Sequence, residues 1–543
     1  MPEPTPMSVR AARIGRLVAL LGAVGLGLFA LIAALIWLGD LADIAKATVK
    51  GGLVPSAAGL LAVILGLVGL AVVARLATGT GSRLRLAIVL GLVVLVVLRI
   101  AIAASYDGVP DGEVADYDRL ARAVLDGHCC FDDRPMGYPI VLSLVYRVVG
   151  AGHPAVELLN IACAIATGAL LFLIARRFLG APAAAVALYL YAIWPAGALM
   201  IVTSLPHTSY ELLVVAAAWA AIATRDGWRG SALAGVILGV SQYLRPTSPL
   251  LLPVLLLARL WPGMPWRRAI TGLLVPMAGF FVLVLVPVLA HNQADHGQLS
   301  LSTSSYGGHS LWVGTDVRSG GRLTDQNSAE VLAMPGADLW QKSDAAGARA
   351  IERMKADPVG IGLLALRKQV TLWGTERYGV QYGIRRELAE NVAHKASVLP
   401  SLASGTFWVL LLIAAAAGLA LRRHRPDRLL ILTVLLVAAV SFLHGFTEVR
   451  DRYHSYAVPL LLPFAAVAIL ALLARMGLVP AGVSGEGEEP TAPLPTAPDP
   501  TDSVTAARPA SDGWPGWRLP RPSIPSYFRH PGPAPASATP GSQ

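Results

Sequence analysis

The chain has 543 residues, of which 55% are hydrophobic and only 14% are charged. A soluble protein of ordinary composition carries roughly 25% charged residues, so this composition excludes that class and indicates a polytopic membrane protein. The formal net charge of +10 is less informative than the positions of Lys and Arg, because cytoplasmic loops collect these residues. We expect the bilayer, and no nucleic acid, as a partner.

Three apolar segments occupy the first hundred residues. They run from about Leu17 to Leu38, from Leu53 to Ala74 and from Leu86 to Ala104. Each is close to the ~20 residues that a helix needs to cross a bilayer. Arginines before the first segment and in the link 75–85 predict that these ends are cytoplasmic. The third segment then leads to the extracytoplasmic side.

The first long polar stretch covers residues 107–139 and contains seven aspartates and one glutamate. Asp111 is a suitable N-cap and Gly127 a suitable helix stop, so we expect a short helix between them. Three residues of this helix recur at a spacing of four and therefore share one face: Glu113, Tyr117 and Ala121. Such a helix, lying on the membrane, would hold the glutamate at the boundary between lipid and water.

The middle of the chain alternates apolar segments with short links. Residues 138–149 are too short to cross and predict an interfacial or re-entrant helix. Arg245-Pro246 divides a later pair of segments, because Pro ends or kinks a helix, and this leaves Arg245 near the outer face. The expected spans are Ala155–Ala175, Ala181–Val202, His207–Ala223, Ser231–Leu244, Pro246–Leu260 and Ala269–Ala290.

A second large polar region follows, in which amphipathic helices are expected, for example near 344–366. Three last spans are expected at Leu402–Leu421, Leu429–Phe446 and Ala457–Leu473, with a short outer loop at 448–453 between the last two. The total is about 12 spans, with both termini in the cytoplasm. The fold class is an all-α polytopic membrane protein with extracytoplasmic loops that carry interfacial helices.

Six regions follow from this assignment. Residues 1–104 are N-terminal transmembrane helices, and 105–153 form the first large outer loop. Residues 154–290 are central transmembrane helices, 291–399 the second large outer loop, and 400–475 the C-terminal transmembrane helices. Residues 476–543 are rich in Pro and poor in aliphatic residues, which predicts a disordered cytoplasmic tail.

Possible metal ligands are few. His128, Cys129 and Cys130 stand next to two aspartates, but the usual zinc spacings are absent, so a metal site is a minor alternative. We assign no metal ligands. Cys163 lies in an apolar run and is expected to be a small core residue.

Several motifs resemble one family when taken in order. They are Glu113, Tyr117 and Ala121, then Gly127, the Pro135–Pro139 segment PMGYP, Arg245-Pro246-Thr247, the stretch that begins at His291-Asn292, and Arg450 to Tyr453. Over about residues 84–475 the chain is similar to the GT-C superfamily of membrane glycosyltransferases. Within it, family 39 is the nearest match, with its protein O-mannosyltransferases and lipid A aminoarabinose transferases.

The resemblance implies a GT-C fold and a hexosyl- or pentosyltransferase in the plasma (inner) membrane. It implies a polyprenyl-phosphate sugar donor, a glycan, lipid or protein acceptor, and an active face outside the cytoplasm. A carboxylate would deprotonate the acceptor in an inverting displacement, with Glu113 as first choice and Asp111 and Asp116 as reserves. Arginines would hold the phosphate. The substrate-binding candidates are Tyr117, Arg134, Tyr138, Arg245, His291, Asn292, Arg450, Arg452 and Tyr453.

Alternatives stay open on the sequence alone. Arg450 can simply pair with Asp451 or Glu448, and Arg245 can extend its head group to the interface. The family often has a second acid where this chain has Val114, and Arg where it has His291. A transporter or flippase of lipid-linked sugars, or a non-catalytic protein of the same fold, therefore remains as an alternative. Some members of the superfamily use a divalent metal, and the sequence leaves that cofactor undecided.

Overall fold

The structure, a computed structural model, describes residues 9–51, 54–106, 112–128, 134–224, 227–385 and 390–480. Every regular element in these ranges is helical. All of these described residues belong to one compact unit. The predicted tail lies outside the described residues from position 481 onward.

The N-terminal helices are α1 (Val9–Gly51), α2 (Val54–Ala77) and α3 (Ser82–Ala104). The first polar stretch holds α4 (Gly112–Leu125) and α5 (Gly137–Val149). The central helices are α6 (His153–Ile193), α7 (Pro195–Leu199), α8 (His207–Ala218), α9 (Trp228–Gln242), α10 (Ser248–Leu260), α11 (Trp266–Ala269) and α12 (Val275–His296). Short 3-10 or π turns connect some of them, namely η1 (Met200–Val202), η2 (Trp219–Ala223) and η3 (Ile270–Leu274).

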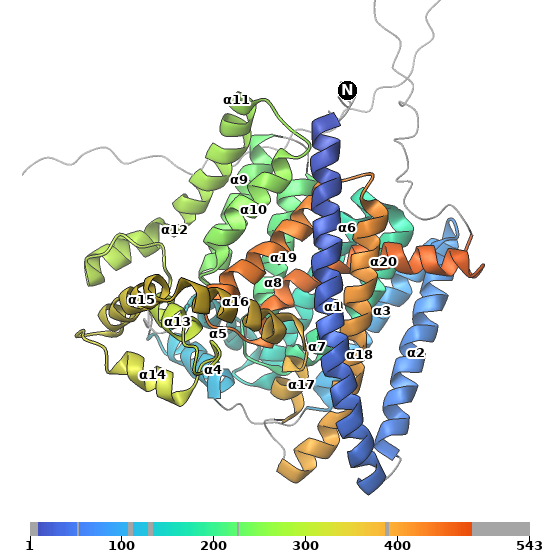
Figure 1. Cartoon of the computed structure of the whole chain (residues 1–543), viewed down its shortest axis with the longest axis horizontal. Helices are drawn as coiled ribbons and strands as arrows, with labels where there is room; N and C mark the ends of the chain where they lie inside the picture. Colours follow the sequence, from blue (N-terminus) through green and yellow to red (C-terminus); the bar gives the residue numbers. More distant parts are fainter. Residues whose placement is uncertain are drawn as a thin grey trace, which may run out of the picture. The chain divides into compact units, whose positions relative to one another are not determined.

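The second polar region holds α13 (Tyr306–Gly314), α14 (Asp325–Leu332), α15 (Leu339–Ala356), α16 (Pro358–Trp373), α17 (Tyr378–Val380) and η4 (Gln381–Arg385). The C-terminal helices are α18 (Glu390–Arg422), α19 (Arg428–Phe446) and α20 (Val458–Arg475), and η5 (Asp451–Ala457) precedes the last of them. Figure 1 shows α4, α5, α13, α14 and α15 at the lower left of the long helices, whereas α17 lies near α7 and α18.

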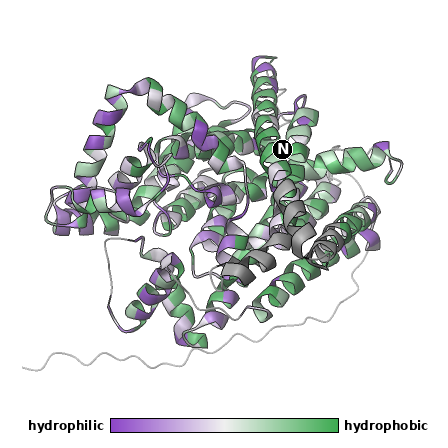
Figure 2. Cartoon of the chain, turned by 60° about the horizontal axis from the view of Figure 1, so that its bottom comes forward, coloured by the Kyte–Doolittle hydropathy of each residue, from purple (hydrophilic) through white to green (hydrophobic). Residues whose placement is uncertain are grey.

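The prediction of a multi-pass, all-helical membrane protein is confirmed. Among the described residues, seven helices are long and apolar enough to cross a membrane, and four shorter apolar helices accompany them. Figure 2 shows that the long helices are mostly hydrophobic, whereas hydrophilic residues concentrate in the short helices and connections. The expected total of about 12 spans stays a prediction.

Two expected features have clear local causes. The break expected between the spans 155–175 and 181–202 lies inside α6 at Gly180, whose φ of 86° is accessible to Gly without a Cβ clash. The region 344–366, where amphipathic helices are expected, holds parts of α15 and α16, which are divided because the side chain of Asp357 caps the backbone of Gly360 and Pro358 opens α16.

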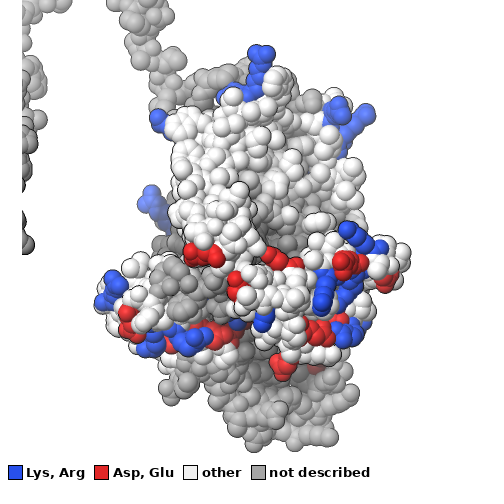
Figure 3. All heavy atoms as spheres, turned by 90° about the vertical axis from the view of Figure 1, so that its left-hand side faces the viewer, with Lys and Arg blue, Asp and Glu red and all other residues white. Residues whose placement is uncertain are grey.

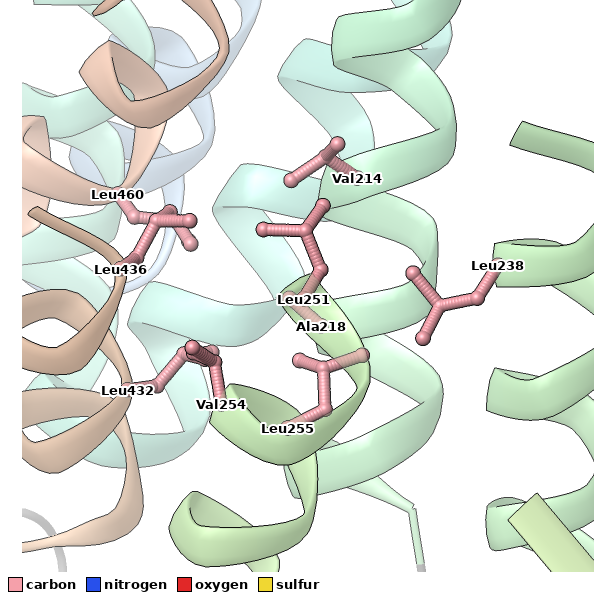
Figure 4. Close-up of a pocket in the computed structure, with 9 residues that line it drawn as sticks. All are labelled: Val214, Ala218, Leu238, Leu251, Val254, Leu255, Leu432, Leu436 and Leu460. Atoms are coloured by element: carbon pink, nitrogen blue, oxygen red, sulfur yellow. The ribbon is translucent and has the colours of Figure 1, made fainter. Parts of the chain in front are cut away.

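The helices pack through an aliphatic core that contains one small cavity. It has a volume of about 10 Å³ and is lined only by apolar side chains. Figure 4 shows these side chains converging from α8, α9, α10, α19 and α20. A site this small with no polar lining holds no ordered water, so we interpret it as a packing defect rather than a ligand site.

Candidate active site

Helix α4 is fixed to the protein by its apolar face. Val114, Tyr117 and Ala121 are buried, and Ser204 donates a hydrogen bond of 2.7 Å to the carbonyl of Val114. Glu113 lies in the first turn on the same side. The shared face expected from the four-residue spacing therefore exists, and it is turned toward the protein interior.

Glu113 forms ion pairs with two arginines that are distant in sequence. One carboxylate oxygen contacts Nη2 of Arg452 at 2.5 Å, across 339 positions of the chain. The other lies 3.5 Å from Nη1 of Arg134. The Glu113 side chain is 22% exposed and that of Arg452 only 2%. The structure thus brings the predicted catalytic acid into contact with two predicted phosphate ligands.

The arginines set the ionisation of this carboxyl group. Burial raises the pKa of Glu113, but the charges of Arg452 and Arg134 outweigh it and lower the pKa to about 2. Burial raises the pKa of the neighbouring Tyr117 to about 12. At neutral pH Glu113 is therefore an anion, while the phenol of Tyr117 keeps its proton.

Arg452 is buried and only partly satisfied. Its guanidinium lies 4.7 Å from the ring centre of Tyr382 and 5.6 Å from that of Tyr453. Within the part of the chain that the structure describes, its Nε and Nη1 have no hydrogen-bond partner. A buried donor without an acceptor carries a desolvation cost, which an anionic ligand would remove.

Arg245 approaches the same region from the link between α9 and α10. Its Nη2 lies 3.2 Å from Nε2 of His207, and its guanidinium is 5.1 Å from the ring centre of Tyr453. The ring of Tyr453 is therefore close to both Arg245 and Arg452. The Arg-Pro break expected from the sequence, between α9 and α10, supplies this arginine.

Arg450 has a protein partner, which is one of the alternatives left open by the sequence. Its Nε donates to Glu448 at 2.8 Å, and Tyr306 of α13 donates to the other oxygen of Glu448 at 3.3 Å. Burial lowers the pKa of Arg450, but the charge of Glu448 outweighs it and the net shift is upward. The second polar region thus reaches the site through α13.

The remaining candidates divide into two groups. Asp116 is 41% exposed and lies 3.5 Å from Arg134, and Tyr138 meets Tyr117 edge to face at 5.7 Å, so both adjoin the centre. His291 pairs with Asp295 at 2.8 Å. Asn292 is buried and donates to the carbonyls of Ser300 and Ser302 at 2.8 and 2.9 Å.

Asn292 therefore holds the turn after α12 and has a local structural role. Asp111, Cys129 and Cys130 lie outside the described residues. Within the described ranges, no group of three or more His, Cys, Asp or Glu residues could hold a metal ion.

Sequence reasoning missed two side chains that shape the site. His207 contacts Arg245, and Tyr382 covers the guanidinium of Arg452. Neither stands in a motif. The sequence signal for His207 was its place at the start of a span, which is also typical of an ordinary interface residue.

An open hollow of about 550 Å³ adjoins the ion pairs on the solvent side. It runs along the polar face of α4 and shares Asp116 with the site. Figure 3 shows Lys, Arg, Asp and Glu mixed across the lower part of one face, above which lies a largely uncharged surface with only Lys and Arg at its far edge. This distribution is typical of a membrane protein with one polar end.

The fold and the site define a multi-pass, all-helical membrane protein in which a carboxylate and several arginines meet outside the long helices. Residues 133–291 match the family described as dolichyl-phosphate-mannose-protein mannosyltransferase. The expected resemblance to this group of membrane glycosyltransferases is thus confirmed over the matched residues. Arg134, Tyr138, Arg245 and His291 fall inside the matched residues, whereas Glu113 and Arg452 fall outside them.

Solved structures give weaker similarities. The chain resembles the oligosaccharyltransferase of Archaeoglobus fulgidus in its apo form, with 13% identity, a TM-score of 0.45 and coverage of 73% of this chain. It spans 51% of that protein. ArnT from Cupriavidus metallidurans bound to undecaprenyl phosphate shows 14% identity and a TM-score of 0.31, with 72% and 79% of the two chains covered. No curated protein sequence matches the chain.

Proposed function

We propose that this protein transfers a sugar from a polyprenyl-phosphate donor to an acceptor hydroxyl on the extracytoplasmic face of the membrane. The contact between Glu113 and Arg452 carries this proposal. It joins a potential general base to a potential phosphate ligand, and these are the two groups that such a transfer needs. The sugar is a hexose or pentose, and the acceptor a glycan, lipid or protein.

The donor phosphate would bind between Arg452 and Arg245. Arg452 has two N–H-bearing nitrogens without partners among the described residues, and a guanidinium binds phosphate through paired hydrogen bonds. Arg245 lies 5.1 Å from the ring centre of Tyr453, which Arg452 also approaches. The two guanidinium groups would hold the phosphate, and the lipid tail of the donor would extend toward the apolar helices.

Donor binding would also activate Glu113. The charges of Arg452 and Arg134 keep the pKa of this carboxyl near 2, which makes it a weak base, since a base works best with a pKa near the operating pH. A phosphate that takes hydrogen bonds from Arg452 would weaken that pairing. The pKa of Glu113 would then rise toward its ordinary value when the donor is in place.

The reaction is a single inverting displacement. The acceptor hydroxyl gives its proton to Glu113 while its oxygen forms a bond to the anomeric carbon. The bond from that carbon to the phosphate oxygen breaks, and the polyprenyl phosphate leaves with the electron pair. The arginines stabilise the charge that grows on the phosphate. The hollow along α4, which includes Asp116, is the side from which the acceptor would approach.

The test is transfer of radiolabelled sugar from a polyprenyl-phosphate donor to a membrane extract by purified protein. Glu113→Gln keeps the shape and removes the base, so turnover at saturating donor should fall by about 10²–10⁴-fold. Glu352→Gln is the matched control, because Glu352 is exposed on α15. Transfer by Glu113→Gln at the wild-type rate would remove Glu113 as the base. If Asp116→Asn abolished transfer instead, the proposed reaction would still hold, with Asp116 as the general base.

A further inference from the structure

Lys368 of α16 is a fully buried cation with an unusual set of partners. Its side chain is 1% exposed. Its Nζ donates to the carbonyls of Gly314 at 2.8 Å, Gly445 at 3.0 Å and Thr447 at 2.5 Å. An ammonium group has three N–H bonds, so these acceptors use all of them. The charge is satisfied entirely by backbone carbonyls.

The three carbonyls lie where helices end. Gly314 is the last residue of α13, and Gly445 stands in the last turn of α19. Carbonyls at a helix C-terminus lack a partner inside the helix and carry the negative end of its dipole. Lys368 therefore caps two helices at once, and its third bond fixes the first residues of the segment 445–454, which we call the arginine loop.

The start of the arginine loop packs directly on α13 and the turn that follows it. A Cβ added at Gly314 would lie 2.3 Å from the carbonyl oxygen of Phe446, so only Gly allows this approach. The backbone N–H of Glu448 donates to the carbonyl of Ser310 at 2.9 Å, and that of Val449 to Gly321 at 3.0 Å. The loop is held between α13 and α16.

The other end of the arginine loop is attached to α16 as well. Nδ1 of His454 lies 2.5 Å from the carbonyl of Leu372. The ring of His454 stacks against those of Trp373, at 5.3 Å, and Trp408, at 4.4 Å. Helix α16 thus holds both ends of the segment whose middle carries Arg450 and Arg452.

We propose that Lys368 is a positioning residue of the donor site, which sets the place of Arg450 and Arg452 by fixing the carbonyls at the start of the arginine loop. The ligand in this proposal, a polyprenyl phosphate, rests on the function proposed above. The positioning itself does not, because it concerns only how the loop is held. Lys368 touches no substrate and acts through the backbone.

Two measurements on Lys368→Met test the proposal. The first is hydrogen exchange of the purified full-length protein, in which amides of residues 445–454 should exchange at least about ten-fold faster while those of α9 and α12 stay unchanged. The second is binding of undecaprenyl phosphate, which should weaken by about 10-fold or more. The reason is that a guanidinium group moved from its position forms poorer hydrogen bonds to the phosphate. Lys355→Met, at an exposed position of α15, is the control for both.

A double-mutant cycle separates positioning from general destabilisation. Combining Lys368→Met with Arg452→Gln should weaken phosphate binding little beyond Arg452→Gln alone, because both changes act on the same guanidinium. Unchanged exchange in 445–454, a uniform rise across all helices, or additive losses would overturn the proposal. Should Lys368→Met fail to fold, Lys368→Gln, which keeps two N–H bonds, takes its place. Wild-type protein that binds no undecaprenyl phosphate would refute the proposed function, and the exchange result would still decide the positioning role.

Discussion

Arg452 and Lys368 are both buried cations at the same end of the molecule, but their hydrogen bonds differ. Lys368 donates to three carbonyls and has no further N–H group to donate. Arg452 pairs with Glu113, and two of its nitrogens have no partner in the described ranges. A saturated cation stabilises the fold, whereas an unsaturated one retains the capacity to bind a ligand.

The comparison also explains how one site can hold several arginines. A buried ion pair costs desolvation that its attraction only partly offsets. For Lys368 this cost is offset by hydrogen bonds to carbonyls at or next to helix ends. Burial nevertheless lowers the pKa of Lys368 to about 7. For Arg452 the desolvation cost is offset only by the carboxylate of Glu113 and by the rings of two tyrosines. We infer that an anion completes the arginine arrangement, and the variants described below test this inference.

The largest effect on donor affinity is expected at Arg452 itself. Arg452→Gln removes the charge and most of the unused donors, so the affinity for a polyprenyl-phosphate donor should fall by about 10²-fold. Binding is measured by retention of labelled donor on proteoliposomes. Arg353→Gln is a suitable control, since Arg353 packs over Trp312 at 3.8 Å in the second polar region. Equal losses in both variants would place the donor elsewhere.

Arg134 should matter less. Its contacts with Glu113 and Asp116 are long, at 3.5 Å each, and its side chain is 27% exposed. Solvent screens such a pair, so Arg134→Gln should reduce transfer by only about 2–10-fold. The rate of sugar transfer at limiting donor is the measurement. A loss as large as that of Arg452→Gln would mean that Arg134 is a primary phosphate ligand.

The sequence predicted part of this site and not the rest. Glu113, Arg134, Arg245 and Arg452 were selected from motifs, because acids and arginines at span ends have no need to be there for crossing a membrane. Their pairing could not be predicted, since 339 positions separate Glu113 from Arg452 and no local periodicity reports such a contact. Lys368 was not selected, because a lysine in an amphipathic helix is usually exposed.

The helices were predicted better than their ends. Apolar length located α3 and α19 to within a few residues, because crossing a bilayer fixes a minimum length. The break between the spans 155–175 and 181–202 was predicted, but the residue that makes it, Gly180, was not, and neither was the boundary between α15 and α16. Single Gly, Asp and Pro residues decide these positions through local backbone geometry. The orientation of the chain stays a prediction from its arginines.

The ionisation of Glu113 gives a dependence of stability on pH. Its pKa of about 2 lies below the ordinary value of 4.5. A lowered pKa stabilises the folded state above pH 4.5, and this contribution is lost as the pH falls toward 2. The difference in unfolding temperature between wild type and Glu113→Gln should therefore be constant near neutral pH and shrink below pH 4.5. A difference that does not change with pH would show that the ion pairs are weak.

The smallest effect on transfer is expected in the apolar core. Leu251 lines the cavity shown in Figure 4, and all of the residues that line this cavity are apolar. Leu251→Ala should lower the free energy of unfolding by about 2–5 kcal/mol and leave the donor affinity of the folded protein unchanged. Thermal unfolding and donor binding measured on one preparation check both parts. A loss of donor affinity without a loss of stability would mean that the packing around this cavity affects the donor site.

The most direct test is single-turnover transfer of labelled sugar by wild type, Glu113→Gln, Arg452→Gln and the double variant. We expect Glu113→Gln to bind donor but to transfer sugar about 10²–10⁴-fold more slowly at saturation, and Arg452→Gln to weaken donor binding. The double variant should lose less than the sum of the two, because the side chains act as one unit. If the wild-type protein is active and both single variants transfer sugar at the wild-type rate, this ion pair is not the catalytic centre.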